Sequence, residues 1–276
     1  MKKIEKHIHN FLIYLAIIIF LIMSMFPIYW LFTLSLKLPH EAFSLPPTWI
    51  FKPTLENYAS TFLYGPFSRY LINSIVVALS NTGLSVMAGS LAAYSLARFN
   101  FRGKKLSLLA VLIAPTIPPI AIAIPLYMIY NDYGLIDTRF SLIITYFIFN
   151  LPFVVWIMYG FFQEIPESLE ESAMLDGCSR LGAMWRIALP LVAPGLAAAS
   201  IICIIYSWNE FLYAMIFTGT YAKTMPVAIT GFITSRGVYW SKVAACGSLV
   251  ILPVFLFILF VQKHLIKGLS LGAVKE

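Results

Sequence analysis

The chain of 276 residues is 60% hydrophobic and only 11% charged, and it carries a formal net charge of +7. Soluble domains contain about 25% charged residues, so this composition excludes a single water-soluble core and favours a polytopic membrane protein. Basic links beside an anionic membrane surface account for the positive charge, so nucleic acid is not expected as a partner.

Six apolar stretches are long enough to cross a hydrocarbon layer, which takes about 20 helical residues. Their apolar runs are continuous rather than alternating, which favours helices over barrel strands. The sequence therefore predicts an all-α integral membrane protein with one transmembrane domain over residues 1–276. The expected spans are 11–36, 71–97, 106–128, 140–163, 195–217 and 244–263.

The Lys and Arg residues predict the orientation. The N-terminal segment, the links after the second and fourth spans, and the C-terminal tail lie on one side and hold twelve of the 19 basic residues. The positive-inside rule puts this side, and with it both termini, in the cytoplasm. The first span is longer than a signal-peptide core of about 7–15 residues, so we expect it to be a retained anchor.

Prolines interrupt the first outer segment and the third span. Segment 37–70 is too polar to cross the membrane and too rich in proline for a long helix, so an ordered external cap is expected. The third span contains Pro115, Pro118, Pro119 and Pro125, each of which lacks a backbone donor. A broken helix at membrane depth is tolerated inside protein or beside a cavity, so both a packing kink and a pore-lining role stay open.

The link 164–194 is a polar run between long apolar segments and carries five of the chain's twelve acidic residues. Pro166 suits the first turn of a helix that runs to about Asp176. Gly177 then favours a stop in left-handed geometry. Ser179 is expected to cap a second short helix through Ile187, which Leu189-Pro190 would end.

The resulting elbow is predicted to dock on another protein. Ser172, Ala173 and Gly177 leave one side with little bulk, while Leu169, Met174 and Leu175 offer apolar anchors. An amphipathic helix lying on the membrane is the alternative, but anionic headgroups would repel so many acidic side chains.

The spacing in this link resembles the EAA loop of binding-protein-dependent ABC importer permeases, the coupling helix that docks on the ATPase subunit. The sequence departs from the usual pattern only by Ser172 in place of a second alanine. The docking residues that the resemblance implies are Glu171, Ser172, Ala173, Asp176, Gly177, Ile187, Leu189 and Pro190.

The resemblance covers nearly the whole chain. Further matching pieces are Asn73-Ser74, Trp208-Asn209-Glu210-Phe211, Gly268-Leu269 and Gly272-Ala273-Val274-Lys275. They look like the carbohydrate-type permeases of the maltose transporter class, and most like the smaller six-span subunit. The resemblance thus implies a sugar importer in a bacterial or archaeal cytoplasmic membrane.

This resemblance also implies the partners. A second related permease subunit would complete the pore, two ATPase subunits would bind ATP and magnesium, and an extracytoplasmic binding protein would deliver the sugar. In the maltose class the loop between the fifth and sixth spans, here 219–242, reaches toward that binding protein, and the C-terminal tail is expected to contact the ATPase. The chain itself should hold no cofactor or metal and should not be an enzyme, because Gly103-Lys104 lacks the other residues of a phosphate-binding loop.

Glu210 is the clearest acid inside a span, about 22 Å from its cytoplasmic end at 1.5 Å per residue. Such a group costs about 3 kcal/mol and usually faces a cavity or a partner. On one continuous helix Tyr206, Asn209, Glu210 and Tyr213 would share a face. Two roles stay open for this face, namely contact with the sugar and hydrogen bonding between permease subunits.

Other transport classes compete with the sugar importer. A sugar-phosphate or polyol importer would show the same elbow. A self-contained secondary transporter would need internal repeats and several intramembrane charges, which the sequence does not offer. An intramembrane enzyme would need a paired nucleophile and base or a metal cluster.

Overall fold

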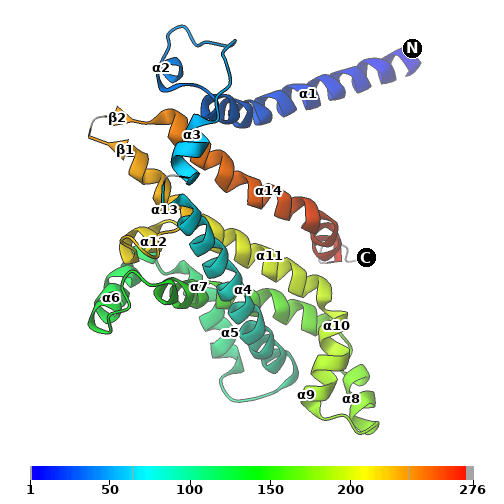
Figure 1. Cartoon of the computed structure of the whole chain (residues 1–276). Helices are drawn as coiled ribbons and strands as arrows, with labels where there is room; N and C mark the ends of the chain where they lie inside the picture. The colour runs from blue at the N-terminus through cyan, green and yellow to red at the C-terminus, as the bar shows by residue number, and fades with distance from the viewer. Residues whose placement is uncertain (1, 64, 236, 272–276) are drawn as a thin grey trace. The chain divides into compact units, whose positions relative to one another are not determined.

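The computed structural model describes residues 2–63, 65–235 and 237–271, with side chains at 6–7, 9–62, 65–235 and 237–256. It is mostly helical, which confirms the all-α class (Figure 1). The α-helices are α1 (Lys2–Ser35), α2 (Pro39–Ala42), α3 (Glu56–Tyr58), α4 (Phe67–Arg98), α5 (Lys104–Ile113), α6 (Pro119–Asp132), α7 (Arg139–Glu164), α8 (Glu167–Leu175), α9 (Arg180–Ala183), α10 (Leu189–Leu191), α11 (Ala193–Asn209), α12 (Leu212–Phe217), α13 (Met225–Ile229) and α14 (Trp240–Leu271). Four short elements complete the backbone: π-helices η1 (Ala59–Leu63) and η3 (Met184–Ala188), and 3₁₀ helices η2 (Ala114–Thr116) and η4 (Thr230–Phe232). Strands β1 (Ile233–Thr234) and β2 (Gly237–Val238) pair antiparallel, with Ile233 opposite Val238.

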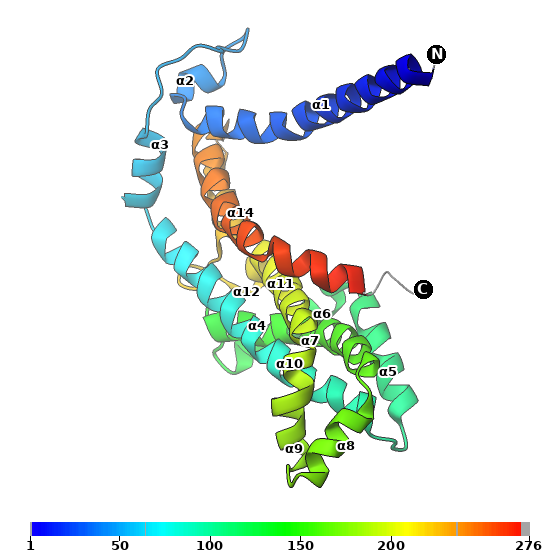
Figure 2. The same cartoon turned by 90° about the vertical axis from the view of Figure 1, so that its right-hand side faces the viewer.

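The chain divides into two compact units, Met1–Ser68 with Ile229–Leu252, and Arg69–Ala228 with Pro253–Glu276. In the first unit, the cap between α1 and α4 is tied to the end of α1. The buried Asn57 amide donates to the carbonyl oxygens of Ser35 and Lys37 at 2.9 and 2.8 Å. The Tyr58 hydroxyl joins Ser35 to Ser248 at 2.7 and 2.8 Å. The proline-rich segment is thus ordered at both ends, although most of its length between α2 and α3 is an extended loop (Figure 2).

The second unit is built on close crossings of α7 with α4 and α11. A Cβ on Gly89 would lie 2.6 Å from a Val154 methyl carbon, and a Cβ on Gly195 would lie 2.5 Å from the Phe161 ring. Small residues let membrane helices approach this closely. Buried side chains such as Tyr94, Met158, Phe162 and Cys203 fill the space between these helices. These two glycines therefore allow the close packing of α4, α7 and α11, the helices to which the polar link is joined.

Fewer continuous spans are found than the six expected. Among the described residues, three helices are long and apolar enough to cross a membrane, at His9–Ser35, Phe67–Arg98 and Arg139–Glu164, and two bent pairs raise the count to as many as five. The described side chains of α14 form a shorter apolar helix over Trp240–Leu256. The predicted break in the third span is confirmed, because α5 with η2 meets α6 at 94°. Pro125, however, lies inside α6 without ending it.

The expected continuous helix over 195–217 is wrong. Helix α11 ends at Asn209, Glu210 has extended backbone angles (φ −66°, ψ 128°), and α12 begins at Leu212. No proline or glycine causes this break. It forms because the Glu210 carboxylate accepts hydrogen bonds from the first free backbone N–H groups of α12, which gives the new helix its start.

Candidate functional site

The polar link forms the elbow that the sequence predicts, and its two helices lie together at one end of the second unit (Figure 1). Pro166 is the N-cap of α8, one residue before its predicted place. Gly177 has φ +93°, and the N–H groups of Cys178 and Gly177 donate to the carbonyls of Ala173 and Met174. This is a Schellman stop. The Ser179 hydroxyl then accepts from the Gly182 N–H at 3.1 Å and caps α9, as predicted.

The end of the second arm differs from the prediction. The helical path does not stop at Leu189-Pro190 but continues through η3 and α10 to Leu191, where the chain bends by 77° into α11. Pro190 is the middle residue of the three-residue α10, directly after the π-helical turn η3. The elbow is therefore longer than expected and joins α11 directly.

The predicted docking residues do not all face outward. Leu189 is buried in the core cluster with Met158 and Phe162, and Ala173 and Ile187 are half-buried. The apolar anchor Leu175 is 89% exposed. Leu181 of α9, which is not among the anchors predicted from the sequence, is 62% exposed. The exposed members of the predicted set are Glu171, Ser172, Asp176, Gly177 and Pro190.

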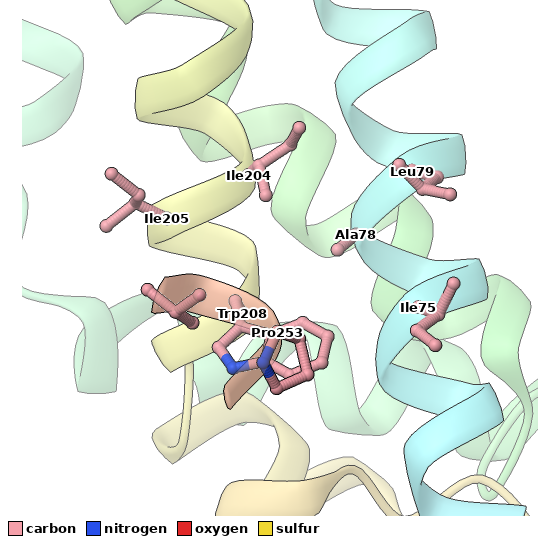
Figure 3. A pocket seen from close by; sticks show the side chains of 8 residues that line it. Ile75, Ala78, Leu79, Ile204, Ile205, Trp208 and Pro253 are labelled. Carbon is pink, nitrogen blue, oxygen red and sulfur yellow. The ribbon is translucent and has the colours of Figure 1, made fainter. Parts of the chain in front are cut away.

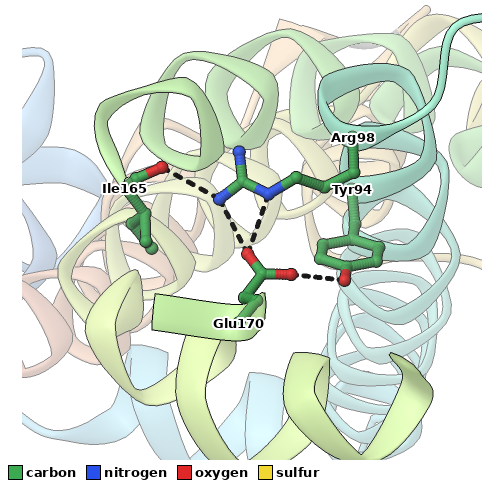
Figure 4. A network of polar contacts seen from close by, with 4 residues as sticks. All are labelled: Tyr94, Arg98, Ile165 and Glu170. Carbon is green, nitrogen blue, oxygen red and sulfur yellow. Dashed lines mark hydrogen bonds and ion pairs between the residues drawn. The ribbon is translucent and has the colours of Figure 1, made fainter. Parts of the chain in front are cut away.

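Glu170, one of the five acids of the link, does not face water, so the link is not exposed along its whole length. Glu170 is 4% exposed, and its Oε1 lies 2.7 Å from Nη2 and 2.8 Å from Nε of Arg98, the last residue of α4. Its Oε2 accepts a hydrogen bond from the Tyr94 hydroxyl. Arg98 also donates to the Ile165 carbonyl at 3.1 Å (Figure 4).

This network joins α8 to the end of α4 by three charge-assisted hydrogen bonds, which are stronger than neutral ones. Both charged side chains are 5% exposed, so loss of either partner would leave an uncompensated charge buried in the protein. The elbow is therefore fixed rigidly to a membrane-length helix. The spacing of Glu170, Ala173 and Met174 on one face of α8 is the sequence signal that could have revealed the inward side.

A cavity of about 280 Å³ lies beside the break between α11 and α12. Aromatic rings dominate it, with Phe153 tilted against Tyr206 at 5.3 Å and Phe149 stacked on Tyr213 at 4.8 Å between centroids. The lining residues are Pro115, Pro119, Tyr146, Phe149, Asn150, Phe153, Tyr206, Ser207, Glu210, Leu212 and Tyr213. Such rings can stack on the C–H faces of a sugar.

The four predicted pathway residues do not share one helical face, because the break separates them. Tyr206 is 52% exposed and lines the cavity. Asn209 is exposed and donates to the Ile205 carbonyl of its own helix. Glu210 accepts from the Tyr213 N–H (2.8 Å), the Ala214 N–H (3.1 Å) and the Tyr146 hydroxyl (2.7 Å). Glu210 is thus a helix cap that also borders the cavity, and the buried Tyr213 supplies a ring to its wall.

A second cavity of about 150 Å³ lies between α4, α11 and Pro253 of α14 (Figure 3). Its lining is apolar apart from the Trp208 indole N–H, which has no hydrogen-bond partner among the described residues. The isoleucine, leucine and alanine side chains around it offer nothing to a sugar hydroxyl. The aromatic cavity at the helix break is therefore the better candidate for a substrate.

The motif Asn73-Ser74 anchors the loop that follows α12. The Asn73 amide donates to the carbonyls of Tyr221 and Lys223, both at 2.8 Å, and its oxygen accepts from Arg139 Nε at 2.7 Å. The Ser74 hydroxyl accepts from the Met225 N–H at 2.9 Å. The motif therefore positions part of the predicted outer loop 219–242.

Asp137 anchors the same loop from the turn between α6 and α7. Its carboxylate accepts from the N–H groups of Gly219, Thr220, Tyr221 and Ala222 at 2.8–3.1 Å. Partial burial alone would raise the pKa of this carboxyl, but the four backbone donors outweigh burial and lower the pKa below its ordinary value of 3.8.

Asp137→Asn is expected to release the loop, because the amide nitrogen would face backbone donors that need an acceptor. Hydrogen exchange at residues 219–222 should speed up at least tenfold at neutral pH. In the wild type, the depressed pKa means that the stabilisation is complete above pH about 4 and is lost as the pH falls through the lowered value. Protection in Asp137→Asn should not depend on pH in this window. The exposed Asp132, changed to Asn, is the control, and equal protection in wild type and Asp137→Asn would contradict this role.

The comparisons with known proteins agree with this architecture. A family model described as the binding-protein-dependent transport system inner membrane component matches residues 85–271. The trehalose transport system permease protein SugB of Mycobacterium tuberculosis is 37% identical to this chain. The alignment covers 91% of this chain and 93% of SugB. The trehalose/maltose transport system permease protein MalG of Thermococcus litoralis is 33% identical, with 98% of this chain and 99% of the relative covered.

A solved structure shares the fold. The crystal structure of a bacterial ABC transporter involved in the import of the acidic polysaccharide alginate contains a chain that matches with a TM-score of 0.79 at 22% identity, over 94% of this chain and 97% of that one. The chain belongs to the family of binding-protein-dependent transport system inner membrane components. It is a permease of the ABC importer type, as the sequence resemblance implied.

Proposed function

We propose that the chain is the permease subunit of an ATP-driven importer for a sugar or oligosaccharide. The relatives named for trehalose and maltose transport support the substrate class. The aromatic cavity at the break after α11 supports it further, since Tyr206 and Phe153 present ring surface there. A sugar phosphate or polyol is the alternative cargo within the same class.

The subunit would cross the membrane six times with both termini in the cytoplasm, with α5–α6 and α11–α12 as bent spans and α14 as the sixth. It would pair with a second related permease, rest on two ATPase subunits that bind ATP and magnesium, and receive sugar from an extracytoplasmic binding protein. The tail residues Gly272–Lys275 lie outside the described residues, so their proposed contact with the ATPase rests on the resemblance alone.

The observation that carries the coupling role is the pair of exposed leucines on an elbow that an ion pair holds to α4. Leu175 and Leu181 project from a polar link with 89% and 62% exposure, and exposed apolar side chains on such a surface favour burial against a partner. The Glu170–Arg98 pair would transmit a movement of that partner to α4. Alternating access would follow when closure of the ATPase dimer moves the elbow.

Gly177→Val tests this proposal. A β-branched residue at φ +93° costs about 1–2 kcal/mol in backbone strain alone, and its bulk would stand where the partner approaches. We expect ATPase capture in a pull-down, and sugar uptake by the reassembled transporter, each to fall at least tenfold. Gly160→Val is the matched control. A Cβ on Gly160 of α7, like one on Gly177, would meet nothing within 4 Å, but Gly160 does not have a positive φ.

Unchanged ATPase capture and uptake in Gly177→Val would refute the coupling assignment. A self-contained secondary transporter is distinguished by a separate result. The purified chain alone, in liposomes with an ion gradient and without ATP, should then accumulate sugar. The importer proposal expects no accumulation until the partner subunits and ATP are present.

A further inference from the structure

Lys37 is a buried lysine for which the described residues provide no carboxylate within ion-pair distance. The residue is 3% exposed. Its Nζ lies over the rings of Trp30 and Phe51, at 4.8 and 5.0 Å from their centroids. Cation–π contacts offset only part of the cost of taking an ammonium out of water. An anion beside Nζ would close this deficit.

A cavity for such an anion adjoins the lysine. It measures about 290 Å³ and is walled by Trp30, Lys37, Glu41, Ala42, Phe43, Ser44, Leu45 and Pro47. One water needs about 10–15 Å³ of such space, so the cavity accommodates a group of several heavy atoms. Glu41 is half-buried in the same wall, and one of its oxygens accepts from the Leu38 N–H at 3.1 Å. The site thus presents a cation and a carboxylate to one occupant.

The position of the cavity points to a lipid. Lys37 lies two residues beyond the end of α1, whose segment His9–Ser35 is apolar enough to span a bilayer. A group at the end of a span lies at the level of the headgroups. Trp30 and Trp49, in edge contact at 5.5 Å, are the residues that anchor proteins at this level.

The loop around the cavity would contact the acyl chains of that lipid. Phe43, Leu45, Trp49 and Ile50 are 59%, 91%, 60% and 97% exposed. Four large apolar side chains within eight residues are unfavourable in water. Beside the end of a membrane span they are favourable, because they can enter the bilayer edge.

We propose that Lys37 and Glu41 bind the headgroup of one phospholipid that carries a phosphate and a primary ammonium, as in phosphatidylethanolamine. The phosphate pairs with Lys37 and the ammonium with Glu41. An anionic headgroup without an amine leaves Glu41 facing negative charge, so the site prefers the zwitterionic lipid. This inference does not depend on the transported substrate.

Native mass spectrometry of the full chain tests the proposal, after reconstitution in phosphatidylcholine nanodiscs with 10% phosphatidylethanolamine or 10% phosphatidylglycerol. We expect the wild type to retain one phosphatidylethanolamine with at least a fivefold preference over the other two lipids. Lys37→Met should lose this retention, Lys37→Arg should keep it, and Glu41→Gln should keep a bound lipid but lose the preference. Lys52→Met, which changes an exposed lysine of the same segment, should match the wild type.

Three outcomes would overturn the proposal. Equal retention in wild type and Lys37→Met, with both folded by circular dichroism, would show that Lys37 holds no lipid. A preference for phosphatidylglycerol would show that Glu41 does not bind the headgroup ammonium. Displacement of the lipid by soluble phosphoethanolamine would assign the site to a free ligand, whereas a lipid held also by the exposed Leu45 and Ile50 should resist displacement.

Discussion

Glu170→Ala is expected to lower ATP-driven sugar uptake at least tenfold and to reduce the free energy of unfolding by about 3–5 kcal/mol. The variant leaves the Arg98 guanidinium buried at 5% exposure without its anion. It also removes the acceptor of the Tyr94 hydroxyl. Because both donors belong to α4 and Glu170 belongs to α8, the same change cuts the link between the elbow and the membrane helix.

The measurements are sugar uptake in proteoliposomes that contain the complete transporter, and thermal unfolding of the permease in detergent. Glu171→Ala is the matched control, because this neighbouring acid is exposed and most exposed substitutions change stability by less than about 0.5 kcal/mol. The loss of stability should belong to Glu170→Ala alone, whatever the effect of the two variants on ATPase capture. Wild-type stability and uptake in Glu170→Ala would refute the role of the pair.

A double variant separates folding from coupling. Replacing a buried ion pair by apolar side chains of similar size is often neutral or stabilising, so Glu170→Leu with Arg98→Met should regain most of the lost stability. Uptake should stay low, because the double variant lacks the charge-assisted hydrogen bonds from Arg98 to Glu170 that fix α8 to α4. Full recovery of uptake would mean that packing alone transmits the movement.

The elbow could be predicted from the sequence because its signals are local. Gly177 ends α8 because only glycine adopts φ +93° without strain, and Ser179 caps α9 through a group three residues away. The break near Pro118 in the third span is likewise encoded by the residues at the break itself. Such features need no knowledge of the rest of the fold.

The partner of Glu170 and the break at Glu210 could not be predicted, because both involve tertiary contacts. Arg98 is 72 residues from Glu170, and although Ala173 and Met174 indicate an inward side of α8, nothing in the polar link identifies Arg98 as the partner. The fifth span has no residue that forbids a helix at Glu210. Besides the local cap that Glu210 provides, two tertiary contacts hold the residues at the break: the Tyr146 hydroxyl donates to Glu210, and the Tyr213 hydroxyl donates to the Pro119 carbonyl at 3.1 Å.

Glu210→Ala is expected to destabilise the permease by about 2–4 kcal/mol, the sum of a lost helix cap and an unsatisfied Tyr146 hydroxyl. The cavity beside the break should lose its shape, because Tyr213 and Leu212 in its wall belong to the helix that Glu210 starts. Thermal unfolding in detergent and sugar uptake by the complete transporter measure the two effects. Both should fall together in this variant.

Glu210→Gln decides whether the carboxylate also touches the sugar. Glutamine keeps one oxygen, which can still accept from the Tyr213 N–H, while its amide loses the bond from the Ala214 N–H but can donate to the Tyr146 oxygen. A capping role therefore predicts uptake within about threefold of wild type, a loss of about 0.7 kcal/mol by the usual relation of free energy to rate. Asn209→Ala is the control, since Asn209 bonds only within α11 among the described contacts and should leave stability and uptake unchanged. A loss of uptake in Glu210→Gln at wild-type stability would contradict a purely structural role, because the helix cap would still be present. It would instead place the Glu210 carboxylate in contact with the sugar.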